Sequence, residues 1–171
     1  MVQKKIATVA DLLHSPANFF AFGFGSGLAP YASGTFGTLP ALVICALLGG
    51  LNIVLYVAII AAAFGIGVWF CNEATSYLGT HDHGAIVWDE IVGMMVTMVA
   101  VPVSAGTLIA GFFLFRFFDV WKPGPIRWMD ENIDGGLGIM IDDVFAGALA
   151  CIALHLLIYY VPQVAGFMRL Y

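Results

Sequence analysis

The chain has 171 residues, of which 61% are hydrophobic and only 10% are charged, and its mean hydropathy is +0.97. A soluble domain carries about 25% charged residues, so this composition excludes a soluble enzyme, a nucleic-acid-binding protein and a disordered tail. The formal net charge of −5 also leaves no general basic patch for nucleic acid or anionic lipid. The three cysteines lie far apart in apolar runs, and we interpret them as small core residues.

The N-terminal 40 residues do not have the pattern of a regular membrane span. Residues 1–19 contain two lysines and several polar residues that interrupt a signal-peptide core, so we expect a retained, amphipathic segment on the membrane surface. Phe20–Pro40 is apolar but rich in Gly and Pro, which predicts a re-entrant or broken segment covered by protein. Ser33 or Thr35 is expected to cap a helix that runs to about Leu48.

Long stretches without charge predict the remaining helices. No Asp, Glu, Lys or Arg occurs between Leu12 and Asn72, and residues 91–115 and 144–168 are equally free of charge. A helix needs about 20 apolar residues to cross the hydrocarbon core. The predicted fold is therefore an all-α, polytopic membrane helix bundle of about five spans. After the helix that ends near Leu48, the predicted spans are Leu51–Cys71, Ile86–Val101, Ala105–Trp121 and Ile139–Val161.

The segment from Pro102 to Gly106 allows two interpretations. It could kink one long span, or it could be the turn of a hairpin between two shorter spans. With the N-terminus inside and five alternating helices, every charged residue except Arg169 falls on the cytoplasmic face. Most Lys and Arg residues then lie inside, as the positive-inside rule requires. This distribution of charge favours the hairpin.

Two clusters of polar residues fall at this cytoplasmic face. The first runs from His81, Asp82 and His83 to Asp89 and Glu90, which lie in the first turn of a predicted helix. Its carboxylates could simply stabilise the helix N-terminus, by about 0.3–1 kcal/mol each. The second cluster has Arg116, Asp119 and Lys122 three residues apart on one helical face, followed by Arg127. It could equally be a snorkelling arginine with an ion-pair partner.

The third cluster is the adjacent pair Asp142 and Asp143, which enters an otherwise apolar span. A charge within the bilayer costs about 2.5–3.5 kcal/mol on insertion scales, so this pair is predicted to be functional. Up to six carboxylates could thus face one pocket: Asp82, Asp89, Glu90, Asp119, Asp142 and Asp143. Crowded carboxylates repel each other unless a cation binds, and all-oxygen ligation indicates Mg²⁺, with Mn²⁺ as the alternative.

Positive groups on the same face indicate an anionic ligand. Arg and Lys side chains suit a phosphate, and helix N-termini expected near Thr35, Val87 and Met140 would offer free backbone N–H groups. Together with a metal, these groups indicate chemistry on a phosphorylated lipid head group. The nucleophile loop of cysteine-dependent phosphatases and the Walker phosphate-binding loop are both absent from the sequence.

Five segments resemble the phosphatidylglycerophosphatase A family. They are GFGSGLAP (23–30), GTFGT (34–38), HDHGAIVWDEIVG (81–93), FRFFDVWKPGPIR (115–127) and GGLGIMIDD (135–143). We expect one membrane-embedded catalytic domain over residues 1–171, with its active site facing the cytoplasm. The resemblance, which runs from about residue 17 to 160, implies an enzyme of a bacterial inner membrane. It further implies Mg²⁺-dependent hydrolysis of phosphatidylglycerophosphate to phosphatidylglycerol and phosphate.

Within this resemblance we assign roles to these residues as a hypothesis of metal-assisted hydrolysis. The expected metal ligands are Asp89, Glu90, Asp142 and Asp143, with Asp82 as a possible fifth ligand. The expected phosphate-binding residues are Arg116, Lys122, Arg127, Thr35 and His81, although His81 could equally orient its loop. The expected catalytic residues are Asp119, His83 and Asp82, acting on water or on the leaving oxygen, and a phosphoaspartate at Asp119 or Asp142 stays open.

Two other functions compete with this interpretation. Carboxylates at helix ends beside a broken segment are also typical of a cation-coupled transporter. Against this, the two halves of the chain show no inverted repeat, and the charges gather at one surface and not at the midplane. The second alternative is a phosphatase that acts on another phospholipid head group.

Overall fold

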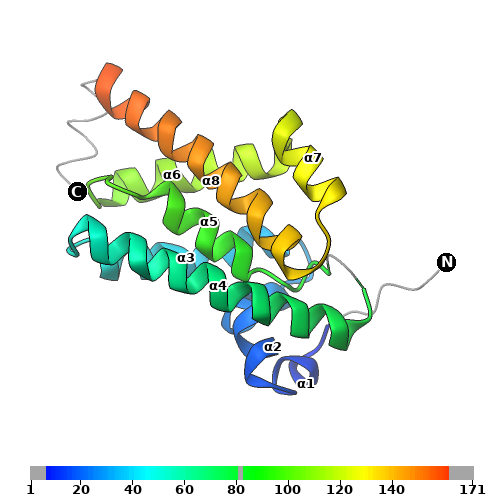
Figure 1. The fold of residues 1–171 in the computed structure, drawn as a ribbon. Helices are drawn as coiled ribbons and strands as arrows, with labels where there is room; N and C mark the ends of the chain where they lie inside the picture. The colour runs from blue at the N-terminus through cyan, green and yellow to red at the C-terminus, as the bar shows by residue number, and fades with distance from the viewer. Residues whose placement is uncertain (1–6, 81–82, 162–171) are drawn as a thin grey trace.

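The computed structural model describes residues 7–80 and 83–161, and within them every regular element is helical. This confirms the all-α prediction. Figure 1 shows the longer helices layered around α5, with α1 and α2 at one end. The elements are α1 (Val9–Leu12), α2 (Pro16–Ala21), the 3₁₀ helix η1 (Gly23–Leu28), α3 (Ser33–Leu48), α4 (Ile53–Leu78), α5 (Trp88–Thr97), α6 (Ala105–Trp121), α7 (Gly124–Asn132) and α8 (Gly135–Tyr160).

Two helices of the described residues, α4 and α8, are long and apolar enough to cross a membrane. Asn52 caps α4, its Oδ1 accepting a hydrogen bond from the Leu55 N–H at 3.0 Å, and Gly79 ends the helix in a left-handed conformation. Only 17% of the most apolar window of α4 is buried inside the protein, against 50% for α8. The outer face of α4 is therefore apolar surface that only lipid or another protein could cover.

Helix α5 is the central helix of the bundle, in contact with α3, α4, α6 and α8. It covers only Trp88–Thr97, so the predicted span Ile86–Val101 is too long at both ends. At 1.5 Å per residue α5 is about 15 Å long, roughly half of the hydrocarbon thickness. A helix this short is tolerated at membrane depth because its neighbours cover it, and most of its residues are buried.

Helices α5 and α6 form a hairpin. The chain leaves α5 at Thr97 and re-enters helix at Ala105, where Ser104 and Thr107 form a capping box. The two helices run antiparallel, because Gly93 faces Phe115 near one end of the pair and Gly111 faces Met98 near the other. The structure therefore agrees with the hairpin and not with a single kinked span.

Several predicted helix ends are wrong. Helix α3 is preceded by Ala32 in a left-handed conformation with no side-chain cap, so neither Ser33 nor Thr35 is its N-cap. Helix α4 continues to Leu78, beyond the predicted end at Cys71, because apolar positions on its inner face extend into the polar stretch. Helix α8 begins at Gly135 and not near Met140, which places its N-terminus more than one turn earlier. Helix α7 was not predicted.

The N-terminal segment packs against the end of α4. The Tyr77 hydroxyl donates a hydrogen bond to Asp11 Oδ1 at 3.0 Å, and the rings of His14 and Tyr77 stack with centroids 4.1 Å apart. Asn18 Nδ2 donates to the Asp11 carbonyl, and both residues are buried. Residues 7–21 are thus tied to the bundle, while residues 1–6 of the predicted surface segment lie outside the described residues.

Close contact between α5 and α8 depends on two glycines. A Cβ atom on Gly147 would overlap the Gly93 carbonyl oxygen, and a Cβ on Gly93 would meet the Phe115 ring and the Asp143 carbonyl. The Thr97 hydroxyl donates to the Gly93 carbonyl at 3.0 Å and lies 3.4 Å from the Gly147 carbonyl. Any larger side chain at this crossing would push the two helix backbones apart.

We predict that Gly147→Ala destabilises the protein. The added methyl group overlaps backbone, which cannot rotate away, so the loss should reach about 1–3 kcal/mol and lower the Tm measured in detergent. Gly65→Ala in α4 is the matched control, since a Cβ there meets no atom within 4 Å. Better helix propensity should leave its Tm unchanged or raise it. Equal Tm values for the two variants would contradict the close crossing.

Candidate active site

A polar pocket opens at the end of the bundle where α3, α5 and α8 begin and α6 ends. Its lining combines small and acidic residues with Lys122, one of the residues predicted to bind phosphate. The lining residues are Ser33, Gly84, Ile86, Asp89, Glu90, Asp119, Lys122, Gly138, Ile139, Asp142 and Asp143. The structure therefore gathers carboxylates from three segments that are far apart in the sequence.

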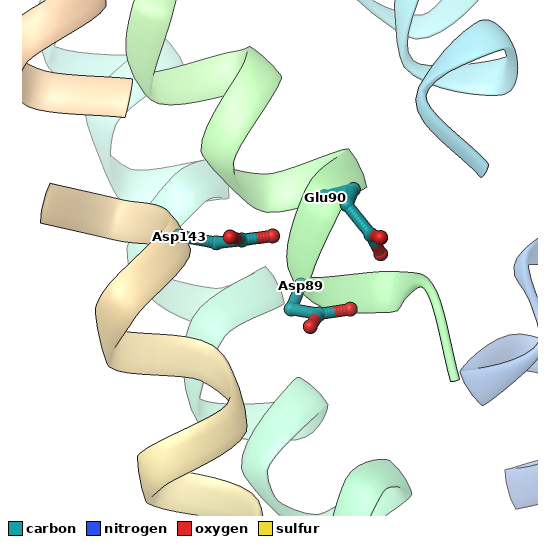
Figure 2. A group of neighbouring side chains, drawn as sticks. All are labelled: Asp89, Glu90 and Asp143. Carbon is teal, nitrogen blue, oxygen red and sulfur yellow. The ribbon is translucent and has the colours of Figure 1, made fainter. Parts of the chain in front are cut away.

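Three of these carboxylates form a tight cluster, which we call the acidic triad: Asp89, Glu90 and Asp143. One oxygen from each side chain lies within 4.8 Å of the other two, a spacing at which the three could share one metal ion. Figure 2 shows Asp143 extending from α8 toward the first turn of α5, from which Asp89 and Glu90 project. Asp143 lies two turns inside an apolar helix and is only 3% exposed, which is unusual for a charged side chain.

The acidic triad has the chemistry of an oxygen-ligated cation site. Asp89 Oδ1, Glu90 Oε2 and Asp143 Oδ2 are buried and accept no hydrogen bond from the residues that the structure describes. Buried acceptors without a donor are costly, and adjacent carboxylates add their mutual repulsion. A hard divalent cation such as Mg²⁺ or Mn²⁺ would satisfy all three oxygens and offset the charge.

Arg116 connects α6 to the acidic triad. Its guanidinium forms an ion pair with Asp119 on the same helix, and its Nη1 lies 3.7 Å from Glu90 Oε1. Its Nε is buried and donates no hydrogen bond within the described parts of the chain. Arg116 therefore retains an N–H group that could donate a hydrogen bond to an anion in the pocket.

Lys122 lines the pocket. It ends α6 in a left-handed conformation, and its Nζ donates to Asp142 Oδ2 at 2.7 Å. Asp142 therefore lies beside the acidic triad and pairs with a cation. The structure places Asp89, Glu90 and Asp143 together, whereas Asp142 has a separate partner.

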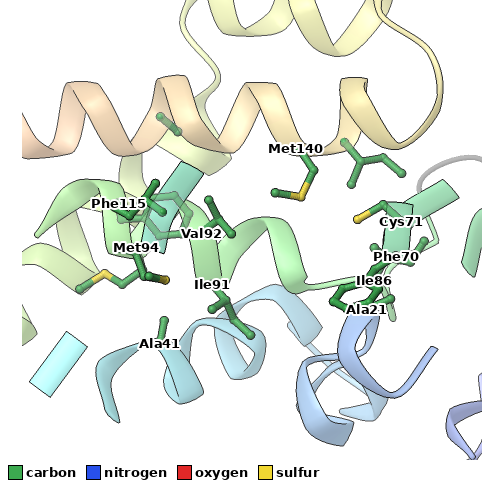
Figure 3. Close-up of a cluster of buried hydrophobic side chains, with 14 of the residues drawn as sticks. Ala21, Ala41, Phe70, Cys71, Ile86, Ile91, Val92, Met94, Phe115 and Met140 are labelled. Atoms are coloured by element: carbon green, nitrogen blue, oxygen red, sulfur yellow. The ribbon is translucent and has the colours of Figure 1, made fainter. Parts of the chain in front are cut away.

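Apolar packing behind the pocket holds the first turns of α5 and α8 in place. Figure 3 shows Ile91, Val92 and Met94 of α5 packed among neighbouring helices, with Phe115 of α6 and Met140 of α8. All five side chains are buried. Because α5 is anchored on every side, its acidic residues cannot move apart without disturbing this core.

The other predicted site residues lie at different distances from the pocket. His83 is buried next to it, and its Nδ1 accepts a hydrogen bond from the Ala85 N–H at 3.2 Å. Thr35 is half-buried in the first turn of α3 and does not line the pocket, and Arg127 is exposed on α7. His81 and Asp82 lie outside the described residues.

Sequence reasoning missed two residues of α3 at the site. Ser33 lines the pocket, although we expected it only as a helix cap. A Cβ atom on Gly34 would overlap Glu90 Oε1 and would lie about 3 Å from both terminal nitrogens of Arg116. The small residues at 33–35, with Gly34 among them, were the available signal, since close approach of a backbone to charged groups requires small side chains.

Comparison with known proteins identifies the family. The family model described as phosphatidylglycerophosphatase A matches residues 19–158, which include every charged residue of the pocket. The chain belongs to the phosphatidylglycerophosphatase A family. A relative in Escherichia coli K12, named phosphatidylglycerophosphatase A, is 41% identical over 160 residues, covering 93% of each chain.

Two further relatives of this phosphatidylglycerophosphatase A family member cover most of its length. One of the same name in Haemophilus influenzae is 43% identical over 150 residues, covering 86% of this chain and 92% of its own. A Bacteroides thetaiotaomicron protein, named as a candidate phosphatidylinositol-3-phosphatase, is 40% identical over 138 residues. The match covers 76% of this chain and 86% of that protein. No solved structure matches the chain significantly.

We predict that Gly34→Ala lowers phosphate release from a lipid phosphomonoester by about tenfold, because Glu90 and Arg116 must shift to admit the methyl group. Both clashing groups are ends of flexible side chains, so the Tm should change little. Gly65→Ala, in open space on α4, is again the matched control. Normal turnover by the Gly34→Ala variant would show that this approach of α3 is not needed for the reaction.

Proposed function

We propose that the chain hydrolyses the terminal phosphomonoester of phosphatidylglycerophosphate, releasing phosphatidylglycerol and phosphate. The observation that carries the proposal is the acidic triad next to Arg116 at one end of an apolar helix bundle. Membership of the family and the names of the Escherichia coli and Haemophilus influenzae relatives support the choice of substrate.

The proposed cofactor is Mg²⁺, or Mn²⁺ in its place, held by Asp89, Glu90 and Asp143. The buried, unpartnered oxygens of these residues support this assignment. When bound, the ion supplies positive charge that offsets the charge developing on the phosphoryl group. Asp142 is a weaker candidate ligand because its Oδ2 accepts a hydrogen bond from Lys122.

Arg116 and Lys122 are the proposed phosphate-binding residues. Arg116 forms an ion pair with Glu90 of the acidic triad, and Lys122 pairs with Asp142, the neighbour of Asp143 in the chain. Each could donate to non-bridging oxygens while it stays close to its carboxylate partner. Arg127 and Thr35 are less well placed, because neither lines the pocket and no described ion pair places either of them against its carboxylates, as one does for Arg116.

Asp119 is the proposed acid–base residue. It is buried at the pocket wall and forms an ion pair with Arg116, which orients its carboxylate. In the reaction, the oxygen of water bonds to phosphorus as the bond from phosphorus to the glycerol oxygen breaks. Asp119 would take the proton of the water and return a proton to the glycerol oxygen. His83 is the alternative for this role, since it is buried beside the pocket.

A different head group is the second candidate substrate. The relative named as a candidate phosphatidylinositol-3-phosphatase shares 40% identity over 138 residues, so the same scaffold could serve another lipid phosphomonoester. Competition between phosphatidylglycerophosphate and phosphatidylinositol 3-phosphate in one assay separates these functions, because the preferred substrate inhibits turnover of the other.

We predict that the reaction depends on a bound metal ion. EDTA should abolish phosphate release from phosphatidylglycerophosphate, and added Mg²⁺ should restore it. Asp143→Asn removes one charged ligand while keeping its shape, and should lower kcat by about a thousandfold or more. Binding of Mn²⁺, followed by its electron paramagnetic resonance signal, should weaken in parallel.

Asp134→Asn is the matched control for this substitution. Asp134 precedes the same helix but is exposed and lies outside the pocket, so its variant should keep both turnover and Mn²⁺ binding. The metal assignment would be wrong if folded Asp143→Asn protein bound Mn²⁺ as tightly as the parent protein.

We further propose that the chain crosses a bacterial inner membrane five times, with the pocket facing the cytoplasm. In a variant with the native cysteines replaced by alanine, Ser76→Cys and Ala105→Cys place thiols at exposed positions near opposite ends of the bundle. An impermeant maleimide added to intact spheroplasts should label only Ala105→Cys, and should label both positions after permeabilisation. Labelling of both from one side would contradict the five-span arrangement.

A further inference from the structure

An apolar groove lies on the outer face of α6, and Arg116 is part of its lining. It is lined by Phe113, Arg116, Phe117, Val120 and Trp121. These positions recur at helical spacing and form one continuous stripe. The four apolar side chains are all exposed, and the rings of Phe117 and Trp121 contact each other with centroids 5.4 Å apart.

Arg116 connects this groove to residues that line the polar pocket. Its guanidinium contacts Glu90 and Asp119, which line the pocket, while the same side chain forms part of the groove wall. A ligand that met Arg116 from the groove side would therefore have a charged end beside the acidic triad and an apolar part against aromatic rings. This combination matches a phospholipid with a terminal phosphate and extended acyl chains.

We propose that the groove on α6 binds an acyl chain of the lipid substrate and guides its head group past Arg116 into the pocket. This assignment rests on the proposed function, and it adds a binding site that the acidic triad alone does not imply. The contacts of Arg116 with Glu90 and Asp119 distinguish this groove from the apolar pocket on α8, whose lining residues 151–159 lie toward the other end of that helix from Asp142 and Asp143.

Filling the groove tests the proposal. Val120→Trp adds a large apolar side chain within it and keeps the surface hydrophobic, so membrane insertion should be preserved. Val54→Trp on α4 is the matched control, because Val54 is 75% exposed and Val120 is 73% exposed. The measured quantity is kcat/KM for dioleoyl phosphatidylglycerophosphate divided by kcat/KM for its water-soluble dibutyryl analogue.

The expected result is a fall of about tenfold in this ratio for Val120→Trp and no change for Val54→Trp. An unchanged ratio for Val120→Trp, or an equal fall for both variants, would overturn the groove assignment. So would conversion of a dimer to a monomer in Val120→Trp alone, since the face would then bind a second copy of the chain.

A second measurement does not depend on turnover. A phosphatidylglycerophosphate with a photoreactive diazirine in one acyl chain is added at low mole fraction to vesicles that contain the protein and EDTA. Labelling of residues 113–121 that excess unlabelled lipid suppresses would support the groove, even if no phosphate release were ever detected. Equal labelling of α4 and α6, without suppression, would overturn it. Absence of hydrolysis of both substrates by the parent protein would instead contradict the proposed function.

Discussion

The close crossing of α5 and α8 is the constraint on which the site depends. Gly93 and Gly147 lie at this crossing, and neither tolerates a Cβ atom without overlap with the backbone or the core. Asp89 and Asp143 lie one helical turn before these two glycines on their respective helices. Because the helix backbones touch at the glycines, the two carboxylates are brought together from segments that are far apart in the chain.

Electrostatics are the reason why we propose a cation for this arrangement. A charge within the bilayer costs about 2.5–3.5 kcal/mol on insertion scales, whereas a helix N-terminus returns about 0.3–1 kcal/mol. The stabilisation by the N-terminus of α5 is therefore too small to offset the cost of burying the charges of its two acidic residues. Among the described residues that line the pocket or pair with it, carboxylates also outnumber Arg116 and Lys122. The remaining negative charge is what a divalent ion would balance.

Composition was enough to predict the long apolar helices. Features that are set by contacts with other helices could not be predicted from the sequence. Charge-free runs located α4 and α8, and the cost of burying Asp143 indicated a functional carboxylate. The shortness of α5 could not be predicted, because a helix covered by other helices need not match the bilayer thickness. The exposure of Arg127 was missed for a related reason. Spacing along the chain does not show that α7 starts a new helix on which Arg127 is exposed.

Arg116 lies between the acidic site and the apolar outer face of α6. An enzyme that acts on a lipid phosphate must bring a charged head group to catalytic residues while the acyl chains stay in an apolar medium. A lysine at this position would offer one compact charge, whereas the planar guanidinium presents donors in several directions. Arg116 uses some of them on Glu90 and Asp119, and its Nε and apolar stem remain on the route between groove and pocket. One side chain can therefore contact both the buried acidic site and the lipid-facing surface.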